Sequence, residues 1–373
     1  MKIILNISRI IVGVLFIFSG LVKANDPLGL SYKMQEFFEV WNWHFLNDYT
    51  LAFSIIMIAF EILAGVAVLL GWKMNLFSWL LLALILFFTF LTGYALFSGK
   101  IRECGCFGDC IPLQAYQSFI KDLVLLVLIA VLFPFRNRIK PLVKPSSALL
   151  ILFFSTIFSF AFQWYALLHL PLVDCLPYKI GNNIPEKLKA PPGSTPDSTV
   201  IVFTYKKNGV DFSFTADNFP QDFNDEYTFV KRADKIVRKG NAQAAIRDFS
   251  LQTIYGNDTT QLLLNEKGYQ LFLFVKDGYA NGEWAEALNL ILKNAGNKNI
   301  PGFLVTNIAI DELRQSAPES FHQLTPLRCD GTAIKTAARV NPTLYLLHDG
   351  TVAGKWAATD LEKALIAIQQ INK

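Results

Sequence analysis

Long apolar runs alternate with short polar connections over the first half of the chain. The runs cover residues 3–22, 51–70, 76–97, 119–133 and 149–170. Each is close to the length that a helix needs to cross a hydrocarbon core of about 30 Å. The fourth run is short, so its helix is expected to begin a few residues earlier. The pattern predicts an all-α transmembrane bundle of four helices plus a fifth.

The second half alternates apolar and polar positions as a globular domain does. Residues 199–215 surround an Asn-Gly pair, which predicts a β-hairpin. The runs 269–275 and 302–306 are almost wholly apolar, as expected of strands buried on both faces. Apolar residues recur at helical spacing over 283–294 and over 361–371, and each of these segments is predicted to form a helix. Together they predict an α/β domain behind the membrane bundle.

The expected order is strand, helix, strand, helix, strand, strand, helix, and it resembles the thioredoxin fold. We expect strands at Phe249 and Leu251 and in the run before His348, and a helix over 311–324. The sequence Asp248-Phe249-Ser250-Leu251 resembles the first strand of the TlpA and peroxiredoxin branch. The resemblance implies a cis peptide before Pro342. It also implies a lost activity, because residues 276–284 contain no Cys-x-x-Cys.

Composition agrees with a membrane protein. Hydrophobic residues make up 53% of the chain and charged residues 17%. The formal net charge is only +4, and no basic run is interleaved with aromatic residues. We therefore expect no nucleic-acid partner. The expected surroundings are a lipid bilayer for the first half and water for the second.

Three of the five cysteines stand close together in residues 104–110, called here the cysteine loop. A bond between Cys104 and Cys106 would close a very small ring around Gly105. Such a bond is strained and easily reduced, which suits thiol exchange. Cys110 is a candidate resolving or shuttle thiol. Two alternatives stay open: inert thiols in a tight turn, or a metal site completed by a fourth ligand.

Loop charges predict the orientation of the helices. The connection after the fourth run carries Arg136, Arg138 and Lys140, so it is expected on the cytoplasmic side. The amino terminus then lies inside. The cysteine loop and the second half of the chain lie outside, together in the periplasm of a bacterium. The expected location is the inner membrane, with the cysteines in an oxidising compartment.

Two charged residues fall inside the predicted helices. Arg9 lies in the first helix and Glu61 in the second, and the helices run in opposite directions. A charge within the bilayer usually has a partner or a function. We predict an Arg9–Glu61 pair, with a site for a polar headgroup, a quinone or a proton as the alternative. Asp122, which follows Lys121, is expected near the membrane surface.

The first 135 residues resemble a known family. The pattern around Arg9, Gly13, Glu61 and Gly65 resembles the DoxX family of four-helix membrane proteins. The run Cys104-Gly105-Cys106-Phe107-Gly108 resembles its redox-associated MauE branch. That resemblance implies a role in disulfide formation and in maturation of periplasmic enzymes, including methylamine dehydrogenase. The bundle is also similar to quinone-reducing vitamin K epoxide reductase-type oxidases, although those carry Cys-x-x-Cys.

Four segments follow from these patterns. They are a membrane domain at 1–135, a basic loop and fifth helix at 136–176, a proline-rich linker with an added hairpin region at 177–245, and a thioredoxin-like domain at 246–373. Prolines are expected to keep the linker extended.

Three functions remain open after the sequence is read. The first is a thiol-redox protein that passes electrons to a periplasmic client, a thiol-redox protein or a quinone. The second is a non-catalytic scaffold whose degenerate domain docks a periplasmic partner. A transporter has less support, because no inverted repeat is visible. Cys175 could rest near the cysteine loop, and Cys329 is expected to be a small buried side chain.

Overall fold

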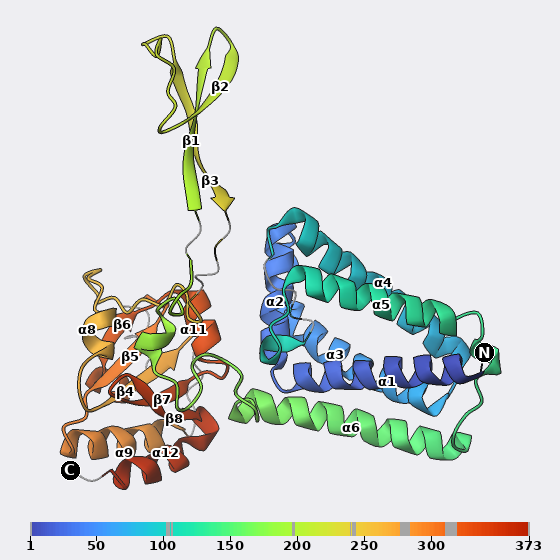
Figure 1. Cartoon of the computed structure of the whole chain (residues 1–373). Coiled ribbons are helices and arrows are strands. Elements are labelled where there is room, and N and C mark those ends of the chain that lie inside the picture. The colour runs from blue at the N-terminus through green and yellow to red at the C-terminus, as the bar shows by residue number, and fades with distance from the viewer. Residues whose placement is uncertain are drawn as a thin grey trace.

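Figure 1 shows a helical bundle, a mixed α/β domain beside one end of it, and a small sheet that projects away from both. The computed structural model describes residues 2–101, 105, 107–195, 198–238, 240, 244–276, 284–309 and 319–371.

Five helices are long and apolar enough to cross a membrane, as the sequence predicts. They are α1 (Lys2–Ala24), α3 (Thr50–Leu70), α4 (Met74–Ser98), α5 (Ala115–Leu132) and α6 (Pro145–His169). Their outer faces carry many exposed large apolar side chains. In water such a surface would aggregate, whereas in a bilayer it is solvated by lipid. The first half of the chain is therefore a multi-pass membrane bundle.

Small residues bring α1 and α3 into close contact. A Cβ atom added to Gly65 would lie 2.8 Å from the carbonyl oxygen of Gly13. A Cβ added to Gly20 would lie 2.6 Å from the Ile62 side chain. Backbones approach this closely only where glycine leaves room. The two glycine contacts fix the register of the antiparallel pair, in which Gly20 faces Ile62 and Gly13 faces Gly65.

A helix that the sequence pattern did not reveal closes one end of the bundle. Helix α2 (Pro27–Val40) begins at Asp26, whose carboxylate accepts the Gly29 N–H at 3.0 Å. Proline at the first helical position adds to this N-terminal signal. In Figure 1, α2 lies across the ends of the long helices. The remaining short helical turns of the bundle are η1 (His44–Tyr49), η2 (Gly108–Cys110) and η3 (Arg136–Arg138).

The α/β domain is built on a five-stranded sheet in the order β6-β5-β4-β7-β8. The strands are β4 (Tyr269–Val275), β5 (Gly302–Thr306), β6 (Thr325–Arg328), β7 (Thr343–His348) and β8 (Thr351–Ala357). Strand β4 pairs in parallel with β5 and antiparallel with β7, and β7 pairs antiparallel with β8. The Asn341–Pro342 peptide bond before β7 is cis, as expected. This order and these directions make the domain thioredoxin-like.

Helices cover both faces of the sheet, and each face has its own apolar core. The shorter elements around it are α7 (Ile184–Lys187), α8 (Thr260–Leu264), α9 (Trp284–Asn297), η4 (Glu319–Gln323), α11 (Gly331–Ala337), η5 (Ala358–Asp360) and α12 (Leu361–Gln369). Side chains of α9 and α12 pack on one face, and those of α7, α8 and α11 on the other. Both faces are therefore dry, which explains the continuous apolar runs of β4 and β5.

The α/β domain and the linker before it differ from the sequence expectations in several places. Phe249 and Leu251 are buried but belong to no strand, because only Gln252 forms isolated bridges there. The expected helix over 311–324 falls largely outside the described residues. Strand β6, which was not predicted, adds an edge to the sheet. The proline-rich linker is not extended throughout, because it contains the helical turn α7, and its Tyr178 is buried in the domain core.

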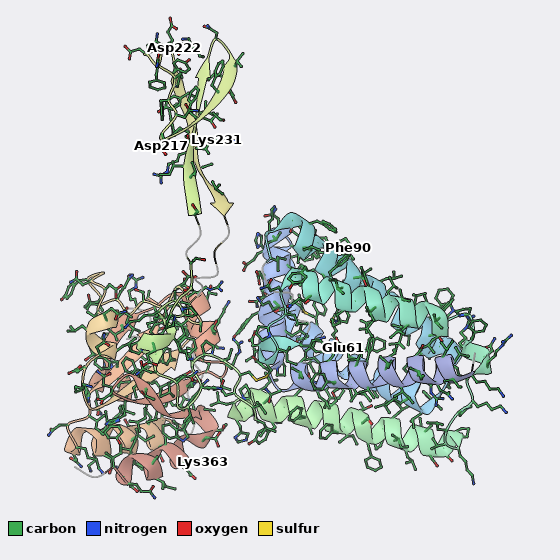
Figure 2. All side chains as sticks on the ribbon, in the orientation of Figure 1. Glu61, Phe90, Asp217, Asp222, Lys231 and Lys363 are labelled. Carbon is green, nitrogen blue, oxygen red and sulfur yellow. A yellow bond between two sulfur atoms is a disulfide. The ribbon has the colours of Figure 1, made fainter. Side chains whose placement is uncertain are left out.

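A separate three-stranded sheet lies between the linker and the thioredoxin-like domain in sequence. Its strands are β1 (Ser198–Lys207), β2 (Val210–Thr215) and β3 (Thr228–Arg238), in the order β2-β1-β3. Asn208 and Gly209 form the predicted turn, with φ of 53° and 82°. Figure 2 marks Asp217, Asp222 and Lys231 on this projecting sheet.

Candidate functional site

Two ion pairs are buried inside the bundle, near the end that carries the cysteine loop. Lys23 Nζ donates to Glu61 Oε1 at 2.6 Å, and Ser19 donates to Glu61 Oε2 at 3.1 Å. Lys121 Nζ lies 2.5 Å from Asp122 Oδ1. Figure 2 places Glu61 among the helices. A charge that is buried away from water is stable only when it is paired, and here each carboxylate is paired with a lysine ammonium.

Both ion pairs border one small cavity of about 20 Å³, together with Phe107 of the cysteine loop. Thr92 extends the network, because its hydroxyl lies 3.0 Å from Asp122 Oδ2. We call this group the polar cluster; its members are Ser19, Lys23, Glu61, Thr92, Lys121 and Asp122. The cluster joins α1, α3, α4 and α5 immediately beside the loop. Asp122 is fully buried within the bundle, where its carboxylate contacts Lys121 and Thr92.

The expected Arg9–Glu61 pair does not form. Arg9 Nη1 donates to the Lys140 carbonyl at 3.3 Å, at the opposite end of the bundle from Glu61. The glycine register explains this difference: α1 and α3 are antiparallel, so Arg9 lies beside Gly71. Glu61 instead lies beside the last turn of α1, where Lys23 supplies the partner charge.

The cysteine loop packs directly on the bundle. Cys104 and Cys106 lie outside the described residues, but Gly105 between them has a φ of +65° and lies against Lys33. The Phe107 ring centroid lies 5.8 Å from that of Phe18 and 5.2 Å from Lys121 Nζ. A Cβ at Gly105 would lie 2.9 Å from Lys33 Cγ. Glycine is therefore required there for both its conformation and its size.

Cys110, at the end of the loop, forms a disulfide with Cys175 beyond α6. Their Cα atoms lie 4.8 Å apart, although 65 residues separate them in sequence. Cys110 is therefore not the free resolving or shuttle thiol that the sequence analysis predicted. The bond fastens the cysteine loop to the start of the linker.

Arg339, three residues before the cis proline, joins the thioredoxin-like domain to the cysteine loop. Its Nε donates to Asp26 at 2.7 Å, and its Nη2 donates to Asp109. The arginine side chain is only 5% exposed. Burial alone would lower its pKa, but the two carboxylates outweigh this effect and raise the pKa of Arg339. The guanidinium therefore stays charged and fixes two segments of the membrane domain at once.

Lys276 makes a second link at the same face. It directly follows β4, where thioredoxins place the active-site segment. Its Nζ donates to the Tyr32 hydroxyl at 2.6 Å and to the carbonyls of Ala338 and Arg339 at 2.9 Å. The side-chain oxygen of Asn341 accepts the Lys276 backbone N–H at 3.0 Å. The cis-proline face of the domain thus lies against α2.

Further contacts hold the domain beside the end of α6. Lys355 Nζ lies 2.7 Å from Asp174, and its side chain is 3% exposed. Burial lowers the pKa of Lys355, and the Asp174 carboxylate offsets part of that effect. His169 Nδ1 lies 3.0 Å from Asp360 Oδ2. These pairs flank the Arg339 contact, so the two domains meet over several charged links.

The described residues contain no group of three or more His, Cys, Asp and Glu side chains arranged to hold a metal ion. Cys329 is buried, and burial raises its pKa to about 11. A thiol with so high a pKa is a poor nucleophile near neutral pH. It matches the small buried side chain that the sequence predicts.

The sequence reading missed Lys23, Asp109 and Arg339. Lys23 was not given a partner because it directly follows the apolar run at 3–22 and resembles an ordinary charge at a helix end, although a long lysine side chain can reach back along a helix. Asp109 and Arg339 have no local signal, since their pairing depends on how two domains meet. A lysine at the end of one helix and a glutamate inside its neighbour would have been a usable clue.

Taken together, the fold and the junction define a multi-pass membrane protein that carries a thioredoxin-like domain on its cysteine loop. Residues 1–135 match the family model described as methylamine utilisation protein MauE. Residues 199–239, which include most of the projecting sheet, match a model described as a domain of unknown function (DUF8463). No curated protein matches the chain. The MauE part of the sequence interpretation is therefore confirmed for the membrane domain.

One similar solved structure is BsSco, a member of the Sco family of cytochrome c oxidase assembly proteins, from work that identifies a disulfide switch in it. The similarity covers 34% of this chain and 94% of that one, at 12% identity and a TM-score of 0.25. The thioredoxin-like description rests on the strand order and the cis proline of this chain.

Proposed function

We propose that this chain is a membrane-bound thiol-redox protein that assists disulfide formation or maturation of periplasmic proteins. Cys104 and Cys106 are the exchanging pair in this proposal. The MauE match supports a redox-associated role for the membrane domain. The Cys-Gly-Cys sequence supports exchange, because a bond within so small a ring is readily reduced.

A single observation carries the proposal: the cis-proline side of the thioredoxin-like domain is bound to the cysteine loop through Arg339 and Asp109. In thioredoxins the cis proline stands beside the active-site thiols. Here the domain's own sequence has no Cys-x-x-Cys, whereas the cysteine loop that contains Asp109 also carries Cys104 and Cys106 in its sequence. The fold then supplies a platform for the client, and the membrane domain supplies the thiols.

The exchange can be written with its electrons balanced. Two client thiols lose two electrons and two protons and form a disulfide. The Cys104–Cys106 bond breaks and takes up both electrons and both protons, leaving two thiols. Attack proceeds through a mixed disulfide between the client and one loop cysteine.

The location follows from the same reasoning. We place the amino terminus in the cytoplasm of a bacterium, the protein in the inner membrane and the thioredoxin-like domain in the periplasm. The basic residues of η3 between α5 and α6 support this orientation. The Cys110–Cys175 bond suits the oxidising side of the membrane.

Serine replacement tests the exchanging pair. The double variant Cys104→Ser, Cys106→Ser should abolish exchange with a small disulfide, such as oxidised glutathione, in the full-length protein in lipid, whereas each single variant should stop at a mixed disulfide with glutathione. Cys329→Ser is the matched control, because that thiol is buried and should leave exchange unchanged. Thiols trapped by alkylation and mapped by mass spectrometry should show Cys104 and Cys106 changing state at mild potential. Undiminished exchange in the double variant would refute the assignment.

A non-catalytic scaffold is the second candidate. It is favoured by the occupied cis-proline face, where Lys276 and Arg339 already bind the membrane domain. A scaffold would keep Cys104 and Cys106 resistant to alkylation both before and after mild reductant. Reactive thiols that change with potential would exclude it.

A further inference from the structure

An apolar groove opens beside the cysteine loop, between α2, α3 and α4. Its volume is about 380 Å³, within the range of roughly 300–1,000 Å³ that small-molecule sites occupy. Met34 lines it from α2, Trp41 from the residue after α2, Met57 from α3 and Leu91 from α4. Aromatic and methionine side chains of this kind accept flat, apolar ligands of varied shape.

One side of the groove faces the place where lipid would lie. Phe53, Ile56 and Phe87 border it and are 40%, 62% and 43% exposed. All three belong to spanning helices. A molecule dissolved in the bilayer could therefore enter from the side, without passing through water.

The otherwise apolar lining of the groove contains three polar side chains, those of Lys23, Lys33 and Thr92, and it includes Gly105 of the cysteine loop. Lys33 is paired with Glu36 and partly exposed, whereas the Lys23 side chain is only 3% exposed. The Lys23 ammonium has three N–H donors, and among the described contacts Glu61 accepts one of them. Its Nζ also lies 4.9 Å from the centre of the Phe88 ring, which borders the groove. A buried cation in the lining of an otherwise apolar groove favours a ligand that carries an acceptor oxygen.

We infer that this groove binds a membrane quinone, with one ring carbonyl directed at Lys23. The inference rests on the proposed thiol chemistry of Cys104 and Cys106. A lipid acyl chain would fill the apolar part but has no oxygen to place beside the ammonium. A quinone has a flat ring and an apolar tail that fit the apolar lining, and carbonyl oxygens that can accept a hydrogen bond from the Lys23 ammonium.

The quinone is the oxidant that restores the Cys104–Cys106 disulfide after each exchange with a client. The two S–H bonds of Cys104 and Cys106 break and an S–S bond forms. Two electrons and two protons pass to the quinone, whose carbonyl oxygens become the hydroxyls of a quinol. Gly105, which stands between the two cysteines in the sequence, lines the groove.

A pair of tryptophan variants on one helix tests the site. Leu91→Trp fills the groove from α4, whereas Leu86→Trp adds the same side chain to a position of α4 that is 51% exposed and does not line it. The full-length protein would be placed in lipid nanodiscs, reduced, freed of reductant and mixed anaerobically with decylubiquinone or menadione. Leu91→Trp should slow quinol formation by about tenfold or more, equivalent to about 1.4 kcal/mol. Leu86→Trp should stay within about twofold.

Photolabelling with an azidoquinone, mapped by mass spectrometry, locates the ligand without relying on turnover. Labels on α2, α3 and α4 at groove residues support the site, and Leu91→Trp should remove them. Labels elsewhere, competition by phospholipid alone, or an unchanged Leu91→Trp rate would overturn the inference. Exchange with oxidised glutathione separates the two proposals. Normal exchange without quinone reduction refutes the quinone site alone, whereas loss of both in the unmodified protein refutes the thiol chemistry as well.

Discussion

Replacing Arg339 with methionine should loosen the thioredoxin-like domain from the cysteine loop. Methionine keeps much of the apolar stem but removes the charge that binds Asp26 and Asp109. Removing one partner from a buried ion pair typically costs about 3–5 kcal/mol, because the remaining charge is left without compensation. Asp109 is 29% exposed and can regain water, which favours the lower end of that range.

A loss of about 3 kcal/mol lowers the ratio of docked to undocked domain by roughly a hundredfold. Hydrogen exchange followed by mass spectrometry, with the full-length protein in nanodiscs, would measure it. Amides in α2 and α11 should exchange faster in Arg339→Met. In Arg339→Lys these amides should exchange at a rate between those of the unmodified protein and Arg339→Met, because lysine keeps the charge but loses the planar guanidinium.

Arg328→Met is the matched control, since Arg328 is an exposed arginine on β6 of the same domain. It should leave exchange in α2 unchanged. Equal protection of α2 in Arg339→Met and the unmodified protein would refute the view that this arginine holds the junction.

Three further predictions concern separate parts of the chain. Gly65→Val should disrupt the bundle and lower its thermal stability, because a Cβ alone would lie 2.8 Å from a backbone oxygen, whereas Gly296→Ala, with open space around it, should have little effect. Cys329 should resist iodoacetamide at about pH 8 in the native protein and react after denaturation, because burial raises its pKa to about 11. Asp360→Asn should destabilise the protein at neutral pH and lose this effect in acid. Burial raises the pKa of Asp360, but hydrogen bonds from Lys363 and His169 outweigh it, so the folded-state pKa is lowered. The stabilisation is then complete above the ordinary pKa of about 4 and disappears as pH falls through the lowered value, which thermal melts at a series of pH values would reveal.

The long helices and the central strands could be predicted because each repeats one simple pattern over many residues. An apolar run of spanning length allows few alternatives to a membrane helix. The Asn208-Gly209 turn was likewise predictable, since it depends on neighbouring residues, whereas the cis peptide at Pro342 was expected only from the resemblance to thioredoxins. Helix α2 was missed because its apolar and polar residues alternate too irregularly to stand out between aromatic loops.

The site was less predictable because its contacts join distant parts of the chain. Glu61 pairs with Lys23 rather than Arg9 because the glycine contacts set the register of α1 and α3. The positions of the charged residues in the sequence do not determine that register. The Arg339–Asp109 contact spans 230 positions. Such pairs arise from the packing of whole domains, so no local pattern announces them.

The Cys110–Cys175 bond also bears on how the protein is assembled. The chain between these cysteines contains α5, the basic turn and α6, and therefore crosses the membrane and returns. The two thiols come within reach only when both helices have been inserted in opposite directions. A molecule that failed to insert α6 would keep Cys110 free beside the Cys-Gly-Cys pair. The disulfide can therefore form only in a molecule whose α5 and α6 have both been inserted, so it is a covalent mark of completed insertion.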